Sequence, residues 1–297
     1  MDGSPGIGVV VEGGGLRGSF GVGVLAELAT WGARLPLPIT HLFATSSGAP
    51  NAAFFAAGQI EDGVRIWNER THGRELIDFR NLVGRGDIMK IDELVEVFRG
   101  DILLHGERFA ADAGSPELHV SVTNVETGGN EVLRATPSNV HALLTAAMAV
   151  PIAYGRPVPV THADGRTRGW YIDGGFGAPV AVREAVAAGL AKILVVLTKP
   201  AGHRRKRNTL AAFLQGRSYP RHPLARQAIA DKWMHYNATL DLLAELEATG
   251  KAYVLRPPHE PPARRLSRSK EAITASIELG RATLREHADA LSGYFAR

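Results

Sequence analysis

The feature that most constrains the fold of this chain is a short apolar segment that ends at a run of glycines. Residues Ile7–Val11 are apolar and mostly β-branched, which predicts a buried parallel strand. The glycine-rich residues 12–18 follow directly, and residues 19–30 have the apolar spacing of a helix. A strand, a glycine turn and a helix in this order indicate an α/β protein, in which helices cover a parallel sheet.

The same order of elements repeats along the chain. We expect strands at residues 39–44, 118–124, 131–135, 170–172 and 192–197, and helices at 47–57, 139–148 and 182–188. Residues 60–110 mix polar helical stretches with glycines, which predicts an insertion over the sheet and a candidate lid. After residue 200 we expect helices at 224–246 and 270–294 and an edge strand at 252–256. Residues 201–297 are therefore a mainly helical C-terminal extension, packed on the same domain as residues 1–200.

Composition excludes several kinds of site. The 297 residues contain no cysteine, which rules out disulfides, a thiolate nucleophile and a cysteine zinc site. The first residues lack the basic and apolar regions of a secretory signal, and no apolar run approaches the roughly 20 residues of a membrane span. We therefore expect a cytoplasmic protein, which can lie at the periphery of a membrane.

Positive charge is concentrated in residues 201–226 and 264–270, although the net charge is only +4. Such clusters attract anionic membranes or nucleic acid, and they are equally typical of a solvated loop and helix face. No aromatic residue interleaves with the basic residues 204–207, which argues against single-stranded nucleic acid. We expect no nucleic-acid partner and a contact with anionic membranes.

Three interpretations of the glycine segment are open. Gly13, Gly15 and Gly18 match the spacing of a dinucleotide-binding loop, but the second strand ends without the carboxylate that would bind the ribose. A Walker loop is excluded, because Gly18 is followed by Ser-Phe. The second interpretation is an oxyanion hole, since consecutive glycines direct backbone N–H groups into a pocket. The third is a tight turn without chemistry.

A serine in residues 44–48 (Ala-Thr-Ser-Ser-Gly) is a candidate nucleophile. The segment resembles the G-x-S-x-G elbow, in which small residues on either side of the serine let a strand turn sharply into a helix. Gly48 stands two residues after Ser46, so Ser46 is favoured over Ser47. Ala44 replaces the first glycine of the pattern. The alternative is that Ser46 only caps the following helix.

A serine nucleophile needs a base, and Asp173 in residues 171–175 (Tyr-Ile-Asp-Gly-Gly) ends a predicted strand. The alternative role is an Asx-type turn. A Ser–Asp–His triad is a further alternative, because five histidines follow Asp173, but none lies in a distinctive loop after a strand. The histidines also lack the H-x-x-x-H and H-E-x-x-H spacings, so we expect no metal site.

Together, the GGGLRG loop, the elbow around Ser46 and the later Asp-Gly-Gly resemble the patatin-like phospholipases, relatives of the catalytic domain of cytosolic phospholipase A2. The resemblance covers roughly residues 6–199 and implies a three-layer α/β/α fold with residues 1–200 as catalytic domain. It implies a serine acyl hydrolase that cleaves fatty-acyl esters of phospholipids or related lipids without a cofactor. The implied roles are Ser46 as nucleophile, Asp173 as base, the Gly14 and Gly15 N–H groups as oxyanion hole, and Gly13, Arg17, Gly18, Gly48, Gly174 and Gly175 as motif support.

Two other functions remain open at this stage. A nucleotide-binding protein would use the glycine loop and leave Ser46 inert. A degenerate hydrolase would bind lipid without turnover, which the alanine at position 44 suggests. An aspartate with its ordinary pKa of about 4 is a poor base. The hydrolase hypothesis therefore requires a short contact between Ser46 and Asp173 in a desolvated pocket.

Overall fold

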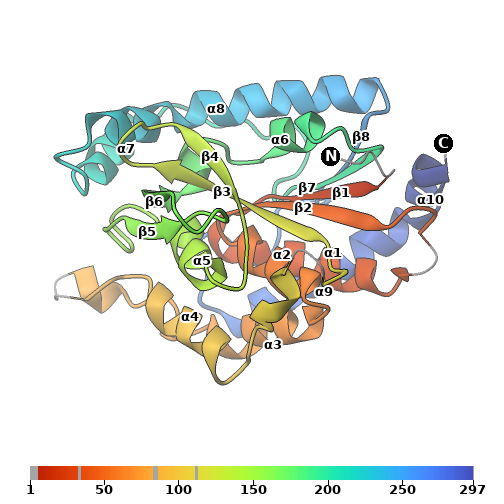
Figure 1. Ribbon diagram of the computed structural model, residues 1–297, viewed down its shortest axis with the longest axis horizontal. Helices are drawn as coiled ribbons and strands as arrows, with labels where there is room; N and C mark the ends of the chain where they lie inside the picture. Colours follow the sequence, from red (N-terminus) through yellow and green to blue (C-terminus); the bar gives the residue numbers. More distant parts are fainter. Residues whose placement is uncertain (1–5, 33–34, 83–85, 111–112, 297) are drawn as a thin grey trace.

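The structure is a computed structural model that describes residues 6–32, 35–82, 86–110 and 113–296. Residues 1–5, on which the expectation of no secretory signal rests, lie outside this range. A mixed, mostly parallel sheet lies between two layers of helices, as the sequence predicts (Figure 1). Within the described residues, no helix combines the length and the apolar character that a membrane crossing needs.

Within these residues, the sheet has eight strands in the order β5-β6-β3-β2-β1-β7-β8, with β4 paired to β3. The strands from β3 to β8 in this order pair in parallel, whereas β4 and β6 run antiparallel to β3 and β5 runs antiparallel to β6. The strands are β1 (Ile7–Val11), β2 (Ile39–Thr45), β3 (Glu117–Asn124), β4 (Asn130–Arg134), β5 (Val158–Thr161), β6 (Arg168–Asp173), β7 (Lys192–Val196) and β8 (Ala252–Leu255).

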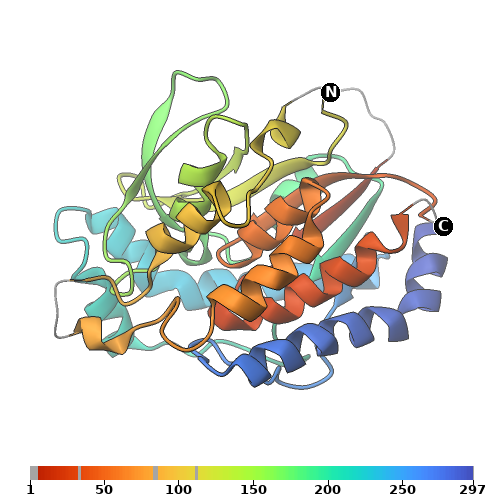
Figure 2. The ribbon, with the colours of Figure 1, turned by 90° about the horizontal axis from the view of Figure 1, so that it is seen from below.

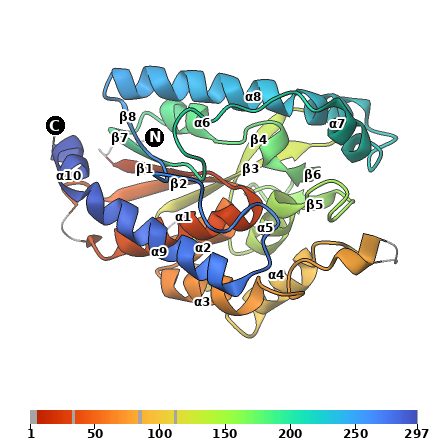
Figure 3. The same cartoon turned by 180° about the vertical axis from the view of Figure 1, so that it is seen from behind.

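One face of the sheet packs on the larger apolar core with α1, α2, α5 and α9, and the other face packs on α6 and α8 (Figures 1 and 3). Helices α1, α3 and α9 lie side by side below the sheet (Figure 2). The main helices are α1 (Gly18–Ala29), α2 (Gly48–Ala56), α3 (Ile60–Arg70), α4 (Ile91–Arg99), α5 (Val140–Met148), α6 (Val182–Ala187), α7 (Thr209–Gly216), α8 (Pro223–Ala248), α9 (Lys270–Glu286) and α10 (Ala288–Ala296).

Helix α9 belongs to the C-terminal part of the chain, and it packs closely on α1 near the N-terminus. A Cβ added to Gly23 of α1 would overlap the backbone of Ile277, and one added to Gly280 of α9 would overlap the carbonyl oxygen of Phe20. Glycine at both positions therefore allows the two backbones to approach. Because α9 packs on α1, the segment that precedes α9 lies next to the glycine loop that precedes α1.

Three features of the C-terminal half differ from the sequence-based expectations. The single helix expected at residues 270–294 is two helices, α9 and α10, because the chain turns at His287, whose Nδ1 is 2.6 Å from the hydroxyl oxygen of Tyr253. Helix α7 was not predicted; Asn208 caps it by accepting from the Ala211 N–H at 2.9 Å. Strand β5 was also not predicted, because it has four residues and a proline, which sheets tolerate at an edge.

The insertion at residues 60–110 forms a wall beside the sheet. Helix α4 buries Ile91, Leu94 and Phe98 on one side, and it packs against α5. Helix α3 buries Ile66 and Trp67 and packs against α1 and α2. These apolar side chains face the space in front of the strand ends that carry the predicted site.

Candidate active site

The ends of β2 and β6 meet on one edge of β3. Strand β2 runs parallel to β3 and its last residue, Thr45, lies opposite Ser121. Strand β6 runs antiparallel, and its last residue, Asp173, lies opposite Val122. Because β4 pairs with both Ser121 and Val122 from the opposite side, β2 and β6 must share the remaining edge. The two strands therefore approach each other end to end, with Ser46 following one and Asp173 closing the other.

Ser46 and Asp173 are directly hydrogen-bonded. The Ser46 hydroxyl donates to Asp173 Oδ2 at 2.6 Å. Ser46 has φ of 54°, in the left-handed region that a residue with a side chain rarely adopts, and such strain is typical of a nucleophile elbow. Helix α2 begins at Gly48 with Ser47 as its N-cap residue, and this cap makes no side-chain hydrogen bond. A capping role therefore does not account for either serine.

Asp173 is buried, and both of its carboxylate oxygens accept hydrogen bonds. Its side chain is buried, with 4% of its surface exposed, and Oδ1 accepts from the Gly175 N–H at 2.7 Å. Burial raises the pKa of Asp173, while the hydrogen bonds from Ser46 and Gly175 and the nearby cations Arg265 and Arg205 oppose this shift. The short contact and the desolvated pocket that the hydrolase hypothesis requires are both present.

The glycine loop lies against Ser46. A Cβ added to Gly13 would overlap the Cβ of Ser46, so glycine is needed for this approach. Gly15 has φ of 61° and begins the short 3-10 helix η1 (Gly15–Arg17), so its N–H has no acceptor within that helix. The Gly14 N–H donates to Ser47 Oγ at 3.2 Å. Of the two predicted oxyanion donors, Gly15 is thus available, and Gly14 is shared with Ser47.

The remaining motif glycines permit close packing around the pair. A Cβ on Gly18 would lie 2.6 Å from Ser47 Oγ, and one on Gly48 would lie 2.7 Å from the carbonyl oxygen of Val11. A Cβ on Gly174 would overlap the carbonyl of the neighbouring strand β3. These residues bring the elbow, the end of β1 and the turn after Asp173 into contact, which is a structural contribution to the site.

The pair opens into a cavity of about 330 Å³. Its walls are mostly apolar and come from α2, α3, α4 and the segment after α5. No histidine is among the lining residues in the described part of the chain, so the triad alternative has no support in this cavity. The apolar lining includes Phe54, Ile66, Trp67, Leu76, Ile91, Leu94, Phe98, Met148 and Val150.

In the described part of the chain, four basic side chains also line the cavity, and the sequence predicted only one of them as part of the site. One comes from the glycine loop, one from the loop after β7, one from α8 and one from the segment before α9. Their positions in the sequence carry no common pattern, so only the fold brings them together. We call them the cationic group: Arg17, Arg205, Lys232 and Arg265.

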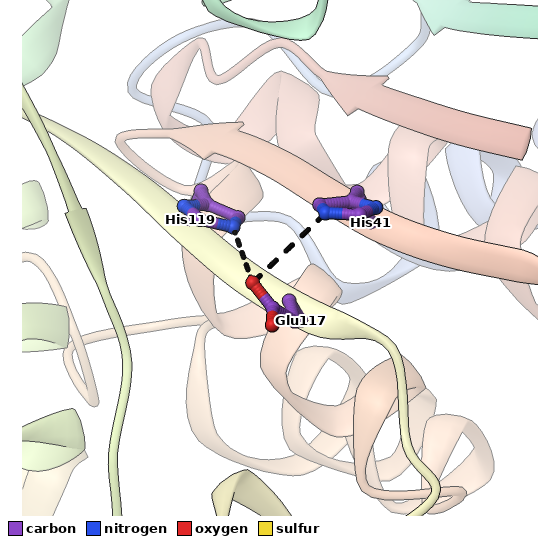
Figure 4. Close-up of side chains that lie close together, drawn as sticks. All are labelled: His41, Glu117 and His119. Carbon is purple, nitrogen blue, oxygen red and sulfur yellow. Dashed lines mark hydrogen bonds and ion pairs between the residues drawn. The ribbon is translucent and has the colours of Figure 1, made fainter. Parts of the chain in front are cut away.

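A second polar cluster lies at the other end of β2 and β3 (Figure 4). Glu117 Oε2 is 3.2 Å from His119 Nε2 and 3.9 Å from His41 Nε2, a set of groups that can ligate a divalent metal. Glu117 Oε1 is also 3.1 Å from an Arg134 nitrogen, so a cross-strand ion-pair cluster accounts for this arrangement without a metal. The histidine spacing did not reveal the cluster, because its members come from two strands.

A mostly parallel sheet thus presents a strained serine, a buried aspartate and a glycine loop to an apolar cavity. The family model described as patatin-like phospholipase matches residues 9–186, and the chain belongs to this family. A second model, a domain of unknown function (DUF6363), matches residues 222–296.

Individual relatives are distant. The uncharacterized protein YjjU of Escherichia coli is 29% identical over 196 residues, which cover 65% of this chain and 52% of YjjU, about half of that relative's length. Human GIVD cytosolic phospholipase A2 has a TM-score of 0.53 at 12% identity, over 98% of this chain and 62% of that one, which shows a shared fold. VipD from Legionella pneumophila has a TM-score of 0.44 at 12% identity, over 97% of this chain and 67% of that one.

Proposed function

We propose that this protein is a serine acyl hydrolase that cleaves fatty-acyl esters of phospholipids or related lipids, with Ser46 as nucleophile and Asp173 as general base. The observation that carries the proposal is the 2.6 Å hydrogen bond from Ser46 to a buried aspartate at the edge of an apolar cavity. A nucleophile needs an adjacent base, and an acyl chain needs an apolar site. Membership of the patatin-like family supports the same reaction class.

The proposed reaction has two halves. Ser46 Oγ attacks the ester carbonyl as its proton passes to Asp173, and the oxyanion accepts hydrogen bonds from the Gly15 N–H and the Gly14 N–H. Collapse of this intermediate expels the alcohol, which takes the proton from Asp173 and leaves an acyl-enzyme. Asp173 then accepts a proton from water as the water oxygen attacks the acyl group. Collapse of this second intermediate breaks the bond to Ser46 Oγ, which takes the proton back from Asp173 and releases the fatty acid.

A labelling experiment tests the proposed pair. A fluorophosphonate probe should modify the wild type on Ser46, and Ser46→Ala should lose the label. Ser47→Ala is the matched control, because it removes the neighbouring hydroxyl, which contacts Gly14 and not Asp173. Label on Ser47→Ala at the wild-type site supports the assignment. A wild type that neither takes the label nor hydrolyses any ester would contradict it, and would favour the nucleotide-binding or lipid-binding alternatives.

We further propose that α7 brings the cavity to an anionic membrane. This helix exposes Leu210 (68%) and Phe213 (59%) to solvent, next to the basic residues of the 201–226 stretch. An amphipathic helix with apolar side chains and neighbouring cations is suited to an anionic membrane surface. Gln215 of the same helix lines the cavity, so a membrane held by α7 would lie near the site. A cytoplasmic location remains a prediction from the sequence.

Vesicle sedimentation tests this membrane contact. The Leu210→Ser and Phe213→Ser double variant should bind vesicles containing phosphatidylglycerol less tightly than the wild type. Leu103→Ser removes an exposed leucine far along the chain from α7 and serves as the control. Equal binding by the wild type and the double variant would refute the contact through α7, and would leave the proposed hydrolysis untouched.

A further inference from the structure

Three polar side chains near the start of β2 and β3 form a group that lies apart from the site around Ser46. His41 of β2 lies opposite Glu117 of β3 in the parallel register, and Phe43 lies opposite His119. Because side chains alternate along a strand, these residues share one face of the sheet. The two histidines and the glutamate point toward one another there (Figure 4). The pairing of two strands therefore assembles a group whose members are far apart in the chain.

The nitrogen and oxygen atoms of this group have nearly the spacing that a zinc ion requires. Glu117 Oε2 is 3.2 Å from His119 Nε2 and 3.9 Å from His41 Nε2. One ligand atom of each residue lies within 4.8 Å of the other two. Bonds of about 2.0–2.1 Å to a tetrahedral zinc place its ligand atoms about 3.3 Å apart. Each pair of ligand atoms therefore needs to approach by about 1.5 Å at most, which small side-chain rotations can supply.

Neighbouring side chains hold the other polar atoms of the group. Glu117 Oε1 is 3.1 Å from a guanidinium nitrogen of Arg134, which leaves Oε2 for a metal. His41 Nδ1 is 3.0 Å from Thr40 Oγ1, so this hydroxyl can accept the Nδ1–H and leave the lone pair of the ring on Nε2. Histidines that bind metals are usually oriented in this way, by a hydrogen bond from the ring nitrogen that does not bind the metal.

Ring stacking positions the two histidines before a metal binds. The rings of His41 and His119 are stacked with their centroids 5.7 Å apart, and His119 stacks on Phe43 at 5.0 Å. The ion pair between Glu117 and Arg134 preserves the arrangement without a metal, so the metal-free protein already has the shape of the site. Groups that are positioned before a ligand arrives lose less entropy when they bind it.

The group is open to solvent, and its donor atoms select the class of metal. The exposed fraction of the side chain is 28% for His41, 21% for His119 and 39% for Glu117, so an ion can enter and keep a water molecule as its fourth ligand. Two histidines, one glutamate and a water are a known ligand set of zinc. Calcium and magnesium prefer oxygen ligands alone, whereas imidazole nitrogens favour zinc and the neighbouring transition metals.

We propose that His41, His119 and Glu117 form a binding site for a divalent transition metal, with Zn²⁺ as the ion that this donor set fits. His41 stands five residues before Ser46, about 16 Å away along an extended strand, so the metal takes no part in the proposed reaction. Its effect is structural, because it joins β2 to β3 through their side chains. The expectation of no metal site rested on spacings that place two histidines on one helix, whereas these two stand on neighbouring strands.

Calorimetric titration with zinc chloride tests the site on the full chain without a histidine tag, after EDTA has been dialysed in and removed. We expect one equivalent of zinc to bind with a Kd of about 10 μM or tighter. His41→Ala, His119→Ala and Glu117→Gln should each weaken binding by about tenfold or more, because each removes one of three ligands.

His162→Ala is the matched control for these variants. His162 Nε2 lies 3.9 Å from Glu131 Oε2, and the two side chains are exposed to a similar degree as those of the proposed site. Among the described residues, however, this pair belongs to no group of three metal-binding side chains. The control variant should therefore bind zinc with the wild-type Kd.

Thermal melts give a second readout that does not depend on heats of binding. Zinc at roughly 100 times its Kd should raise the melting temperature of the wild type by about 4 °C, since the ion binds the folded chain. The same zinc concentration should leave the melting temperature of His41→Ala nearly unchanged. The melts also identify any variant that fails to fold, and the other ligand variants then decide.

Three results would overturn the metal site. The first is a wild-type Kd weaker than about 10 μM, and the second is zinc binding that none of the ligand variants weakens. The third is an equal loss in His162→Ala, since zinc would then bind histidines without preference for this group. Ser46→Ala should bind zinc as the wild type does, which separates this inference from the proposed hydrolysis. A loss of binding in Ser46→Ala would place the metal in the cavity and would also refute the site on β2 and β3.

Discussion

Replacing Asp173 with asparagine isolates the chemistry of the proposed base. Asparagine has almost the same shape, so its oxygen can still accept from the Gly175 N–H, but it cannot take the proton of Ser46. The other carboxylate in the described cavity, Glu12, is held by Thr198, and no histidine lines the described cavity, so neither a carboxylate nor an imidazole is placed to replace Asp173. We therefore expect a loss near the middle of the range for general bases, about 10³-fold in kcat. This corresponds to about 4 kcal/mol of transition-state stabilisation.

The same variant should fold at least as stably as the wild type. Burial raises the pKa of Asp173 above its ordinary 3.8, so the folded state binds the proton more tightly than the unfolded state. The wild type therefore loses stability as pH rises through the window between these two pKa values, and this cost persists at neutral pH. Asparagine carries no charge and avoids the cost. A melting temperature equal to or above that of the wild type at pH 7 would separate lost chemistry from lost folding.

The assay is steady-state hydrolysis of a soluble ester, with the rate of fluorophosphonate labelling as a second readout. In the wild type, kcat/KM should fall with decreasing pH around the raised pKa of Asp173, at a higher pH than an ordinary aspartate would titrate. In Asp173→Asn, most of the hydrolysis rate should be lost, and the remaining kcat/KM should no longer fall with decreasing pH in this range. A folded Asp173→Asn protein that keeps more than a tenth of the wild-type kcat would refute the role of Asp173 as base.

Two further perturbations test other parts of the site. Gly15→Ala should abolish labelling of Ser46 in a folded protein, because φ of 61° disfavours alanine and the new Cβ would overlap the backbone of Arg265; wild-type labelling would contradict this. Ala44→Gly should lower the free energy of unfolding by about 1 kcal/mol in denaturant titrations, since it removes a buried methyl and loosens a strand, while esterase activity stays within twofold; a sharp rise in activity would instead support the degenerate-hydrolase alternative.

Much of the fold could be predicted because local patterns specify it. The apolar run Ile7–Val11 is long enough for one buried strand, and the glycines after it allow a tight turn into the helix that follows. Strand β5 and helix α7 were missed because their signals are short and their stability depends on neighbours. The break at His287 was missed for a similar reason: the residue that holds the turn, Tyr253, lies on β8.

For the candidate site, the sequence by itself determined which chemically reactive residues stand at the ends of strands. Ser46 and Asp173 could be singled out because small residues around each one favour a sharp turn at a strand end. The distance between Ser46 and Asp173 was decided by the tertiary structure, since only the register of β2 and β6 on β3 brings the two strand ends together. The raised pKa of Asp173 likewise depends on burial, which no local pattern reports.

The cationic group shows even more clearly which properties the sequence records and which ones only the tertiary structure decides. Arg205 and Arg265 stood in the sequence as parts of two basic stretches, and nothing distinguished them from their exposed neighbours. The fold turns them, with Lys232 of α8, into the cavity that holds Ser46. The identity of most elements follows from contacts between residues close in the chain, which the sequence records. The convergence of charges from distant elements follows from packing of those elements, which only the tertiary structure decides.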